Sequence, residues 1–463
     1  MKVLSRLMVA GVVCFAMNAV AQYAPELAPP LDTPQQAEPS TPAPQIYHRP
    51  GEVIVPASSA LRPEDAGLRA HTNVAIFVPD GRSMYTPSPD LSFETPASLG
   101  CIYRVSLQYS GCNPQNGGIN HPVGGFGAIA LVDAFDNPNA AHDLNVFSSQ
   151  FGLAAPQFRK IYANTSYGTL NGLNASCSGT PRGDTGWGLE EDLDIEYAHA
   201  MAPTAKILLV EACSNSNSDL FFAEEVAGIE VSNRGGGDIS NSWGGGEYPG
   251  EVGSSGDDYF HKYYWNKIVY FASSGDDGWG AAYPSSSPWV VSAGGTTINR
   301  DSSGNYISES CWALSGGGVS SYETWQNPPN IENGMGPWAS FQYAMAGETA
   351  RQTPDISFDA DPNSGANVYD SYGYNGWIVV GGTSLASPAL AGIINAAKNT
   401  LGQAAPGPNY ITMENNMIYG QLYAHEAYPS NFYDVTTGNN GVAAGTGYDQ
   451  CTGVGSVRGH LGK

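Results

Sequence analysis

The feature that most constrains this chain is the run VVGGTSLASPALAGIINAA at residues 379–397. An apolar strand leads into a Gly-Gly turn, and Thr383, Ser384 and a small-residue helical stretch follow. This layout places the Ser384 hydroxyl at a helix start, where backbone N–H groups and the helix dipole stabilise developing negative charge. The pattern is typical of a nucleophile segment, although taken alone it also suits a purely structural strand-turn-helix.

A second segment, GWGLEEDLDIEYAHAMAP at residues 186–203, carries carboxylates at helical spacing. Glu190 and Asp194 are four residues apart and therefore share one face of a helix. Partial burial and a like-charged neighbour raise a carboxyl pKa, so we expect the pair to titrate as a coupled unit and to act as a general base in acid. The burial is predicted from an adjacent apolar stripe of Leu189, Leu193, Tyr197 and Ala200.

Spacing alone leaves the identity of this pair open. Glu191 lies three residues before Asp194, and the helix also carries Asp192 and Glu196, so a solvated acidic face is the plain alternative. None of the eight histidines lies in an HGT-type segment. If Ser384 is a nucleophile, a group other than such a histidine must therefore take its proton.

These residues resemble a known family. GTSLASP at Ser384 is similar to the nucleophile segment of the subtilisin clan, and ExxLD followed by KILLVEA resembles the sedolisin family of serine-carboxyl peptidases. IVYFASSGDDG at residues 268–278 and RQTPDISFDADPNSG at residues 351–365 are also similar to segments of that family. The resemblance covers roughly residues 95–460.

The resemblance implies a catalytic set of Ser384, Glu190, Asp194 and Asp276, with Glu190 preferred to Glu191 by the family spacing. A protonated Asp276 would donate a hydrogen bond to the oxyanion, which a carboxylate cannot do. On sequence alone its neighbour Asp277 is a competitor, since either residue suits a turn.

The resemblance also implies a structural calcium ion. YDVTTGNNGVAAGTGYDQCTGVGS at residues 433–456 is similar to the family's C-terminal calcium loop. A Gly-rich loop with all-oxygen ligands suits this hard cation, although a plain Gly/Asn turn is the alternative. The implied ligands are the carboxylates of Asp434 and Asp449 and the backbone carbonyls of Val435, Gly445 and Gly447.

Short apolar strands separated by helical patterns predict an α/β fold. Helices are clearest at residues 219–233 and 255–267. This alternation favours a parallel sheet with helices on both faces, here a subtilisin-like single catalytic domain ending in the calcium loop. The expected strands are one at the start of residues 126–144, followed by residues 206–212, 238–244, 268–274, 289–295 and 377–382.

Composition divides the chain before this domain. Residues 1–21 have the charged start, apolar core and small-residue end of a secretory signal peptide, and residues 22–63 are Pro-rich and predicted to be a disordered or weakly ordered leader. Residues 64–115 are expected to form a short N-terminal extension or pro-region, and residues 116–463 the peptidase domain. We expect a secreted protein, in the medium or the periplasm, with no membrane anchor.

The net charge of the chain restricts its binding partners, and its cysteine content indicates disulfides. The formal net charge is −24 at pH 7, which argues against binding nucleic acid or anionic membrane. Outside Cys14 of the signal peptide, six cysteines remain, an even number that suits disulfides in an oxidising compartment. Among several possible connectivities, the favoured one pairs Cys101 with Cys112, Cys177 with Cys213, and Cys311 with Cys451.

The function expected from these features is that of a secreted serine-carboxyl endopeptidase, monomeric, acting on polypeptides and best at acidic pH. The alternative from a different class is a catalytically inactive, peptidase-like binding protein. A histidine-dependent subtilisin and an esterase are further options, but the esterase would normally carry a GxSxG elbow where this chain has GTSLA.

Overall fold

The computed structural model describes residues 45–253, 256–261, 267–324, 342, 349–400, 410–423 and 428–461. They belong to one compact unit that begins at Pro44. The predicted signal peptide and the first part of the predicted leader lie outside the described residues. Within the described part of the chain, no helix combines the length and apolar character needed to cross a membrane.

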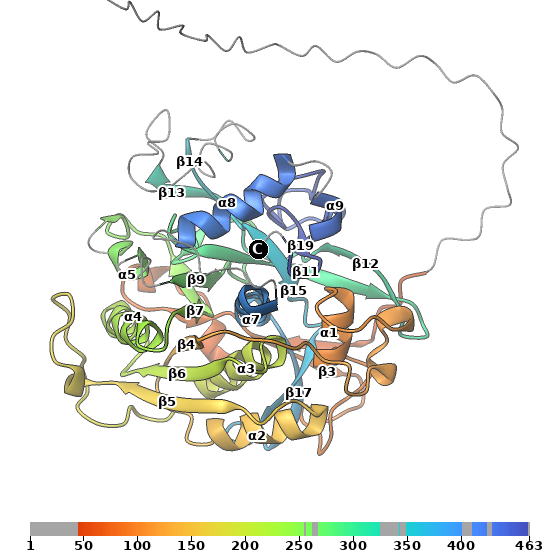
Figure 1. Cartoon of the computed structure of the whole chain (residues 1–463), viewed down its shortest axis with the longest axis horizontal. Helices are drawn as coiled ribbons and strands as arrows, with labels where there is room; N and C mark the ends of the chain where they lie inside the picture. Colours follow the sequence, from red (N-terminus) through yellow and green to blue (C-terminus); the bar gives the residue numbers. More distant parts are fainter. Residues whose placement is uncertain are drawn as a thin grey trace, which may run out of the picture. The chain divides into compact units, whose positions relative to one another are not determined.

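A ten-stranded sheet forms the centre of the unit (Figure 1). Neighbouring strands from β5 to β19 run parallel, while β18 at one end and β12 beside β11 are antiparallel. The predicted parallel sheet is therefore confirmed. Its order is β18 (Phe432–Tyr433), β19 (Ser456–Val457), β15 (Ile356–Asp359), β11 (Val291–Arg300), β9 (Ile268–Ser273), β7 (Gly237–Asn241), β4 (Ala128–Ala134), β6 (Lys206–Ala212) and β5 (Gln157–Ala163), with β12 (Tyr306–Cys311) paired to β11.

Helices cover both faces of this sheet, as the strand pattern predicts. Along β4, Ile129 and Leu131 pack in the same core as α2 (Ala140–Phe151), α3 (Thr185–Met201) and α7 (Thr383–Thr400). Ala130 and Val132 point to the other core, which contains α4 (Asn217–Ser232). This alternation follows from the two-residue period of a strand. The predicted helix at residues 255–267 is represented by a short α5 (Asp258–His261), and residues 262–266 lie outside the described part.

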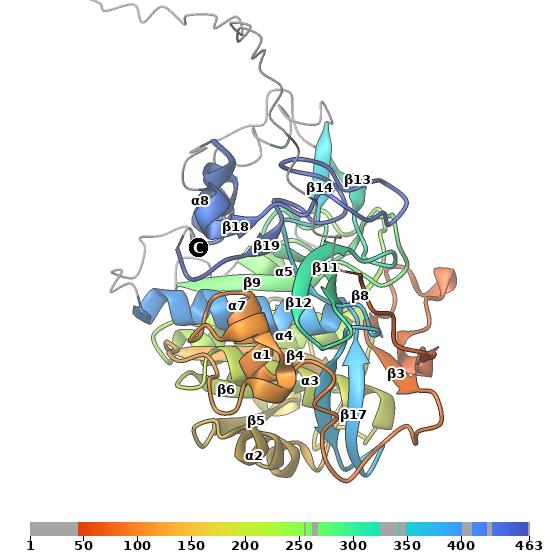
Figure 2. The same ribbon diagram turned by 90° about the vertical axis from the view of Figure 1, so that its right-hand side faces the viewer.

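A second, four-stranded antiparallel sheet has the order β1, β3, β17 and β16 (Figure 2). The strand expected at residues 377–382 belongs here rather than to the parallel sheet. Because β17 pairs with β16 and β3 along both of its edges, no edge is left to join the central strands. The strands are β1 (Gly51–Ile54), β3 (Ala75–Pro79), β17 (Gly376–Gly381) and β16 (Ala366–Asp370).

The segment before the peptidase domain is more ordered than composition suggests. Composition predicts disorder or weak order for residues 45–63, but β1 pairs along its whole length with β3, from Gly51 opposite Pro79 to Ile54 opposite Ile76. Backbone hydrogen bonds supply this order without an apolar side-chain pattern, and most β1 side chains are exposed. A composition-based reading therefore misses it. Further on, β2 (His71–Thr72) joins a small sheet with β8 (Trp243–Gly246) and β10 (Ala282–Tyr283).

Three disulfides cross-link the unit with the favoured pairing. Cys101 of α1 (Pro96–Ile102) is joined to Cys112 nearby in sequence. The other two bonds cross longer distances in sequence, and they join Cys177 to Cys213 and Cys311 to Cys451. The last of these ties the C-terminal loop to the end of β12.

Candidate active site

Ser384 lies at the second residue of α7, directly after the turn that follows β17. The turn depends on Gly382, whose φ of 108° disfavours other residues. A Cβ there would lie 2.0 Å from the Asn73 carbonyl oxygen and 2.5 Å from Asp276 Oδ2. Gly382 therefore brings three groups together at the start of α7: the Ser384 backbone, the Asp276 carboxyl group and residue 73.

Helix α3 supplies Glu190 and Asp194, and both side chains are completely buried. The helix begins after Asp184, whose carboxylate accepts from the backbone N–H groups of Gly186 and Trp187. It packs against α7, α2, β4, β6 and β16, so it is enclosed on every side. The solvated acidic face is thus ruled out, and burial is complete where the stripe predicted it to be partial.

Glu190 adjoins Ser384. Burial raises the pKa of Glu190 well above its usual range, the nearby Asp133 and Asp276 carboxyl groups raise it further, and a hydrogen bond with the Ser384 side chain lowers it. The Ser384 Oγ nevertheless donates to the Ser242 carbonyl at 3.1 Å. Both Glu190 oxygens are buried without a well-formed partner. A small rotation of the serine hydroxyl toward Glu190 would give the pair a nucleophile–base contact.

Asp133 completes the carboxyl cluster and was not singled out from the sequence. It lies in β4 next to its end, and burial raises its pKa to about 8. The negative charge of Asp133 raises the pKa of both Glu190 and Asp194. The three carboxyl groups therefore interact electrostatically. The available signal was an acidic residue near the carboxyl end of a buried parallel strand, where α/β proteins place their functional groups.

The structure distinguishes Glu190 from Glu191. Glu191 accepts from the backbone N–H of Asn137 at 3.1 Å, and the charges that shift its pKa are those of Glu211, Asp133 and Lys160, with no hydrogen bond to Ser384. It therefore points to a different side of α3 from Ser384. Asp194 has Glu190 and Asp133 as charged neighbours, and a hydrogen bond with Ser242 lowers its pKa against the larger effect of burial. The pair of carboxyl groups spaced four residues apart, Glu190 and Asp194, is therefore the one that lies next to Ser384.

Asp276 follows β9 and contacts the turn before Ser384. Its Oδ1 accepts from both the backbone N–H and the hydroxyl of Thr383, at 2.8 Å each, and its Oδ2 is buried without a partner. Burial raises the Asp276 pKa to about 8, although the Thr383 hydrogen bonds oppose this. Asp277 is exposed. Of the two candidates, Asp276 is the one that contacts the turn carrying Ser384.

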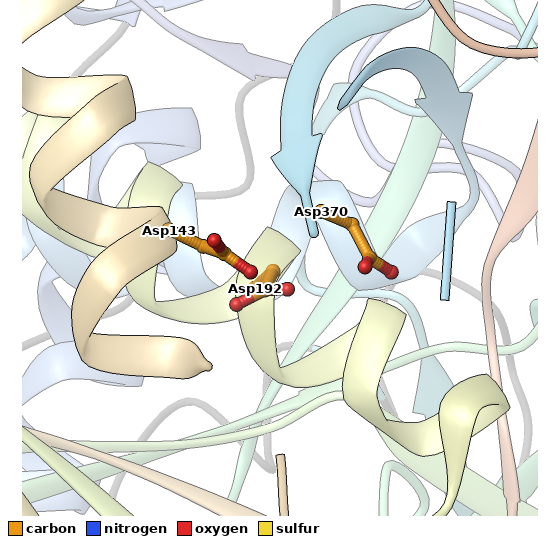
Figure 3. Close-up of side chains that lie close together, drawn as sticks. All are labelled: Asp143, Asp192 and Asp370. Atoms are coloured by element: carbon orange, nitrogen blue, oxygen red, sulfur yellow. The ribbon is translucent and has the colours of Figure 1, made fainter. Parts of the chain in front are cut away.

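One further carboxyl group of α3, that of Asp192, belongs to a separate cluster. Asp192 of α3, Asp143 of α2 and Asp370 of β16 have carboxylate oxygens within 4.8 Å of one another (Figure 3). Burial raises the pKa of Asp192 well above its usual range, and the charges of Asp370 and Asp143 add to this effect. Asp143 accepts from the backbone N–H and hydroxyl of Ser371. At least one group of the cluster is thus expected to keep its proton in neutral solution.

The C-terminal loop has a donor set that suits calcium. Asp434 Oδ1 accepts from Gly447 N–H at 3.0 Å, and Asp449 Oδ2 accepts from Gly445 N–H at 2.9 Å, so both carboxylates border residues 445–447. The Asp449 Oδ1 is held by the Cys451 and Thr452 N–H groups. Oxygen donors arranged around a Gly-rich turn fit this ion.

No histidine hydrogen bonds to Ser384 in the described part of the chain. His199, on α3, contacts the Ala154 carbonyl at 2.9 Å, and burial lowers its pKa to about 4. His71 belongs to a segment that comes near the site. Its Nδ1, however, lies 3.0 Å from the carbonyl oxygen of its neighbour Thr72. The proton acceptors beside the serine are therefore carboxylates.

Known proteins resemble this chain in sequence and in fold. A model of the subtilase family matches residues 174–447. Kumamolisin from Bacillus sp. (strain MN-32) is 28% identical over 71% of this chain and 57% of its own length. Sedolisin from Pseudomonas sp. (strain 101) is 33% identical over 41% of this chain and 33% of its own length. The chain thus spans only part of these relatives.

Among solved structures, Pseudomonas sedolisin, a serine-carboxyl proteinase complexed with two molecules of pseudo-iodotyrostatin, superposes with a TM-score of 0.59 and 25% identity. The match covers 81% of this chain and 96% of that one. The chain belongs to the subtilase family and, within it, to the sedolisins. Its predicted fold class is confirmed.

Proposed function

We propose that this protein is a secreted serine-carboxyl endopeptidase that cleaves polypeptides best in acid. The observation that carries the proposal is the placement of the Ser384 hydroxyl beside the buried Glu190, with Asp194, Asp133 and Asp276 in the same carboxyl cluster. A monomer is sufficient for this chemistry, because all of these groups come from one chain.

In the proposed reaction, Ser384 Oγ attacks the scissile carbonyl carbon while Glu190 accepts the hydroxyl proton. Glu190 returns this proton to the leaving amine, and water then hydrolyses the acyl-enzyme by the same route. Asp194 orients Glu190 and shares its proton. Protonated Asp276 and the Ser384 N–H donate to the oxyanion.

The coupled carboxyl groups give the reason for an acid optimum. Like charges that share one buried site lose their protons in separate steps. Because the protons leave in separate steps, one group can be ionised as the base while the others remain neutral donors. At higher pH further ionisation removes the donors, Asp276 in particular because its pKa is about 8.

Calcium has a structural role in this proposal. Asp434 and Asp449 would bind it with the backbone carbonyls of Val435, Gly445 and Gly447. When bound, the ion supplies positive charge that offsets the two carboxylates and orders the loop. It takes no part in bond cleavage.

The test is a pH–rate profile from about pH 2 to 8 on a denatured protein substrate, with Ser384→Ala and Glu190→Gln as variants. We expect an acid optimum in the wild-type protein and loss of at least about 10³-fold in each variant, since nucleophile and base act as a unit. Full activity in either variant would refute the assignment. An absence of turnover and of labelling by a covalent serine-directed probe would favour the binding protein.

A further inference from the structure

Residues 275–280 carry Asp276 on a loop that follows β9, and we call them the oxyanion segment. Three of these six residues are glycines. Glycine gives a backbone little preference for any one conformation. The position of the Asp276 carboxyl group therefore depends on the contacts that the oxyanion segment makes with the rest of the chain.

One side of the oxyanion segment is bonded to the chain that follows β12. The Gly275 carbonyl accepts from the Gly316 N–H at 2.7 Å, and the Gly278 N–H donates to the Leu314 carbonyl at 2.9 Å. Asp276 therefore lies between two residues whose backbone groups are both fixed to this neighbouring segment.

The C-terminal loop, residues 433–456, holds the end of the oxyanion segment. The Trp279 N–H donates to the Asn440 carbonyl at 2.7 Å, and the Trp279 indole N–H donates to Gln450 Oε1 at 3.1 Å. A Cβ on Gly441 would lie 2.5 Å from the Trp279 Cβ, so the loop backbone packs directly against this side chain. Trp279 is thus held at three points although it is 56% exposed.

Asn440 connects the two supports of the oxyanion segment. Its Nδ2 donates to the Ser315 carbonyl at 2.9 Å and to the Gln450 carbonyl at 3.2 Å. Its Oδ1 accepts from the Val442 N–H at 3.2 Å, and the residue is only 5% exposed. One buried amide therefore ties Ser315 to the C-terminal loop, while the backbone carbonyl of the same residue holds Trp279.

A buried asparagine with every polar group satisfied can also serve stability alone. The place of Asn440 in the hydrogen-bond network argues for more than that. Its carbonyl bonds to a residue three positions after Asp276, and its amide bonds to Ser315, the residue before Gly316. Gly316 in turn bonds to the residue just before Asp276. Both routes out of Asn440 thus end within three residues of the oxyanion donor.

We infer that Asn440 is a positioning residue for Asp276, and that it acts through the backbone of the oxyanion segment. The inference rests on the proposed peptidase function. In that function Asp276 donates to an oxygen that becomes negative only as the tetrahedral intermediate forms. A displaced Asp276 therefore weakens binding of the transition state and leaves binding of the substrate nearly unchanged.

The first experiment compares steady-state kinetics of Asn440→Ala and the wild-type protein on a fluorogenic peptide in acid. We expect kcat to fall by about tenfold, as loss of one net hydrogen bond predicts, and KM to change by less than about twofold. The control is Asn145→Ala, which removes an exposed amide on α2 and should match the wild type in both constants. A wild-type kcat in Asn440→Ala would overturn the inference.

A double-mutant cycle with Asp276→Ala separates positioning from a purely structural role. In the Asp276→Ala background we expect Asn440→Ala to lower kcat by less than about twofold, because no donor is left to be displaced. A structural role would lower kcat by the same factor in both backgrounds. Equal factors would therefore refute the inference.

Trp279→Phe keeps the test valid if Asn440→Ala does not fold. This variant removes the indole N–H bond to Gln450 from an exposed side chain and leaves the backbone bond to Asn440 in place. We expect its kcat to fall by at least about twofold. Its Tm, measured in a Ser384→Ala background, should stay within about 2 °C of the background value, since only an exposed bond is lost. A lowered Tm with an unchanged kcat would contradict positioning.

A peptide aldehyde reports on the same oxygen without turnover. Ser384 Oγ adds to the aldehyde carbon, and the resulting hemiacetal oxygen occupies the oxyanion position. The inhibition constant should rise in Asn440→Ala by the factor by which kcat/KM falls, and an unchanged constant would overturn the inference. An absence of Ser384-dependent hydrolysis in the wild-type protein would refute the peptidase proposal, whereas an active wild type with unaffected variants would refute only the role of Asn440.

Discussion

Asp276 illustrates how one side chain changes role with protonation. Its Oδ1 is satisfied by Thr383, so only Oδ2 is available to a substrate, and it can donate only when it carries a proton. Because burial raises the Asp276 pKa to about 8, the proton is present throughout the acidic range. An aspartic acid can thus serve here as a neutral donor.

We predict that Asp276→Ala lowers kcat by about 10²–10³-fold, the usual effect of removing one oxyanion donor. Asp276→Asn should retain part of the activity, because an amide N–H donates at any pH. Steady-state kinetics on a fluorogenic peptide would measure both. The exposed Asp277→Asn is the control, and a loss there equal to that of Asp276→Ala would contradict the role given to Asp276.

At this scale the sequence predicts most of the site. Ser384, Glu190 and Asp194 follow from a glycine turn, helical spacing and family resemblance, and the structure brings them together. Asn73 could not be predicted, because its contact with the site depends on pairing between strands far apart in sequence. Asp133 gave only the weaker signal of an acidic residue near the end of a buried strand. Local pattern carries no information on such pairings.

Helix α3 is unusual in burying five acidic residues in a protein core, at positions 190, 191, 192, 194 and 196. The cost is small while the carboxyl groups are protonated and large once they ionise, because a buried charge without a partner is strongly unfavourable. The helix is therefore suited to acid. Hydrophobic periodicity alone underestimates its burial, since alternating acidic residues mimic a solvated face.

We predict that Asp192→Asn stabilises the protein at pH 7 but has little effect near pH 3. The folded pKa of Asp192 is raised, so the stability that its protonated form contributes is complete below the unfolded pKa of about 3.9 and is lost as pH rises through the folded value. The asparagine amide carries no charge at either pH, so the variant avoids this loss.

Urea denaturation of the protein with and without Asp192→Asn would give the free energies of unfolding. Both proteins carry Ser384→Ala, which prevents self-digestion. The exposed Asp80→Asn serves as control and should change stability little at either pH. An equal gain at pH 3 and pH 7 for Asp192→Asn would show that burial of the charge is not the cause.

At the level of elements, most central parallel strands could be predicted because they are short apolar runs, whereas β5, with its sequence QFRKIYA, was not expected. The sheet membership of β17 could not, since its sequence is equally suited to either sheet. Strand β1 was missed for a related reason: it is held by backbone pairing, which composition does not reveal.

On the scale of the whole molecule, the Cys311–Cys451 disulfide ties the C-terminal loop, where we propose that calcium binds, to the central sheet. We predict that a chelator lowers Tm, because an ion bound only to the folded state stabilises it, by about 2.7 kcal/mol at 100 times its Kd. Differential scanning calorimetry on Ser384→Ala would measure the change in Tm.

Asp434→Asn should lower Tm and abolish the response to chelator, whereas Asp277→Asn should leave both unchanged. A chelator response that persists in Asp434→Asn would locate the ion elsewhere in the chain.

The pairing of β2 with β8 has a consequence beyond catalysis. A strand edge that accepts any extended chain is also a template for uncontrolled association between molecules. While residues 71–72 occupy it, the protein covers this edge with its own chain. Displacing residues 71–72 would leave this strand edge unpaired and open to association between copies of the molecule.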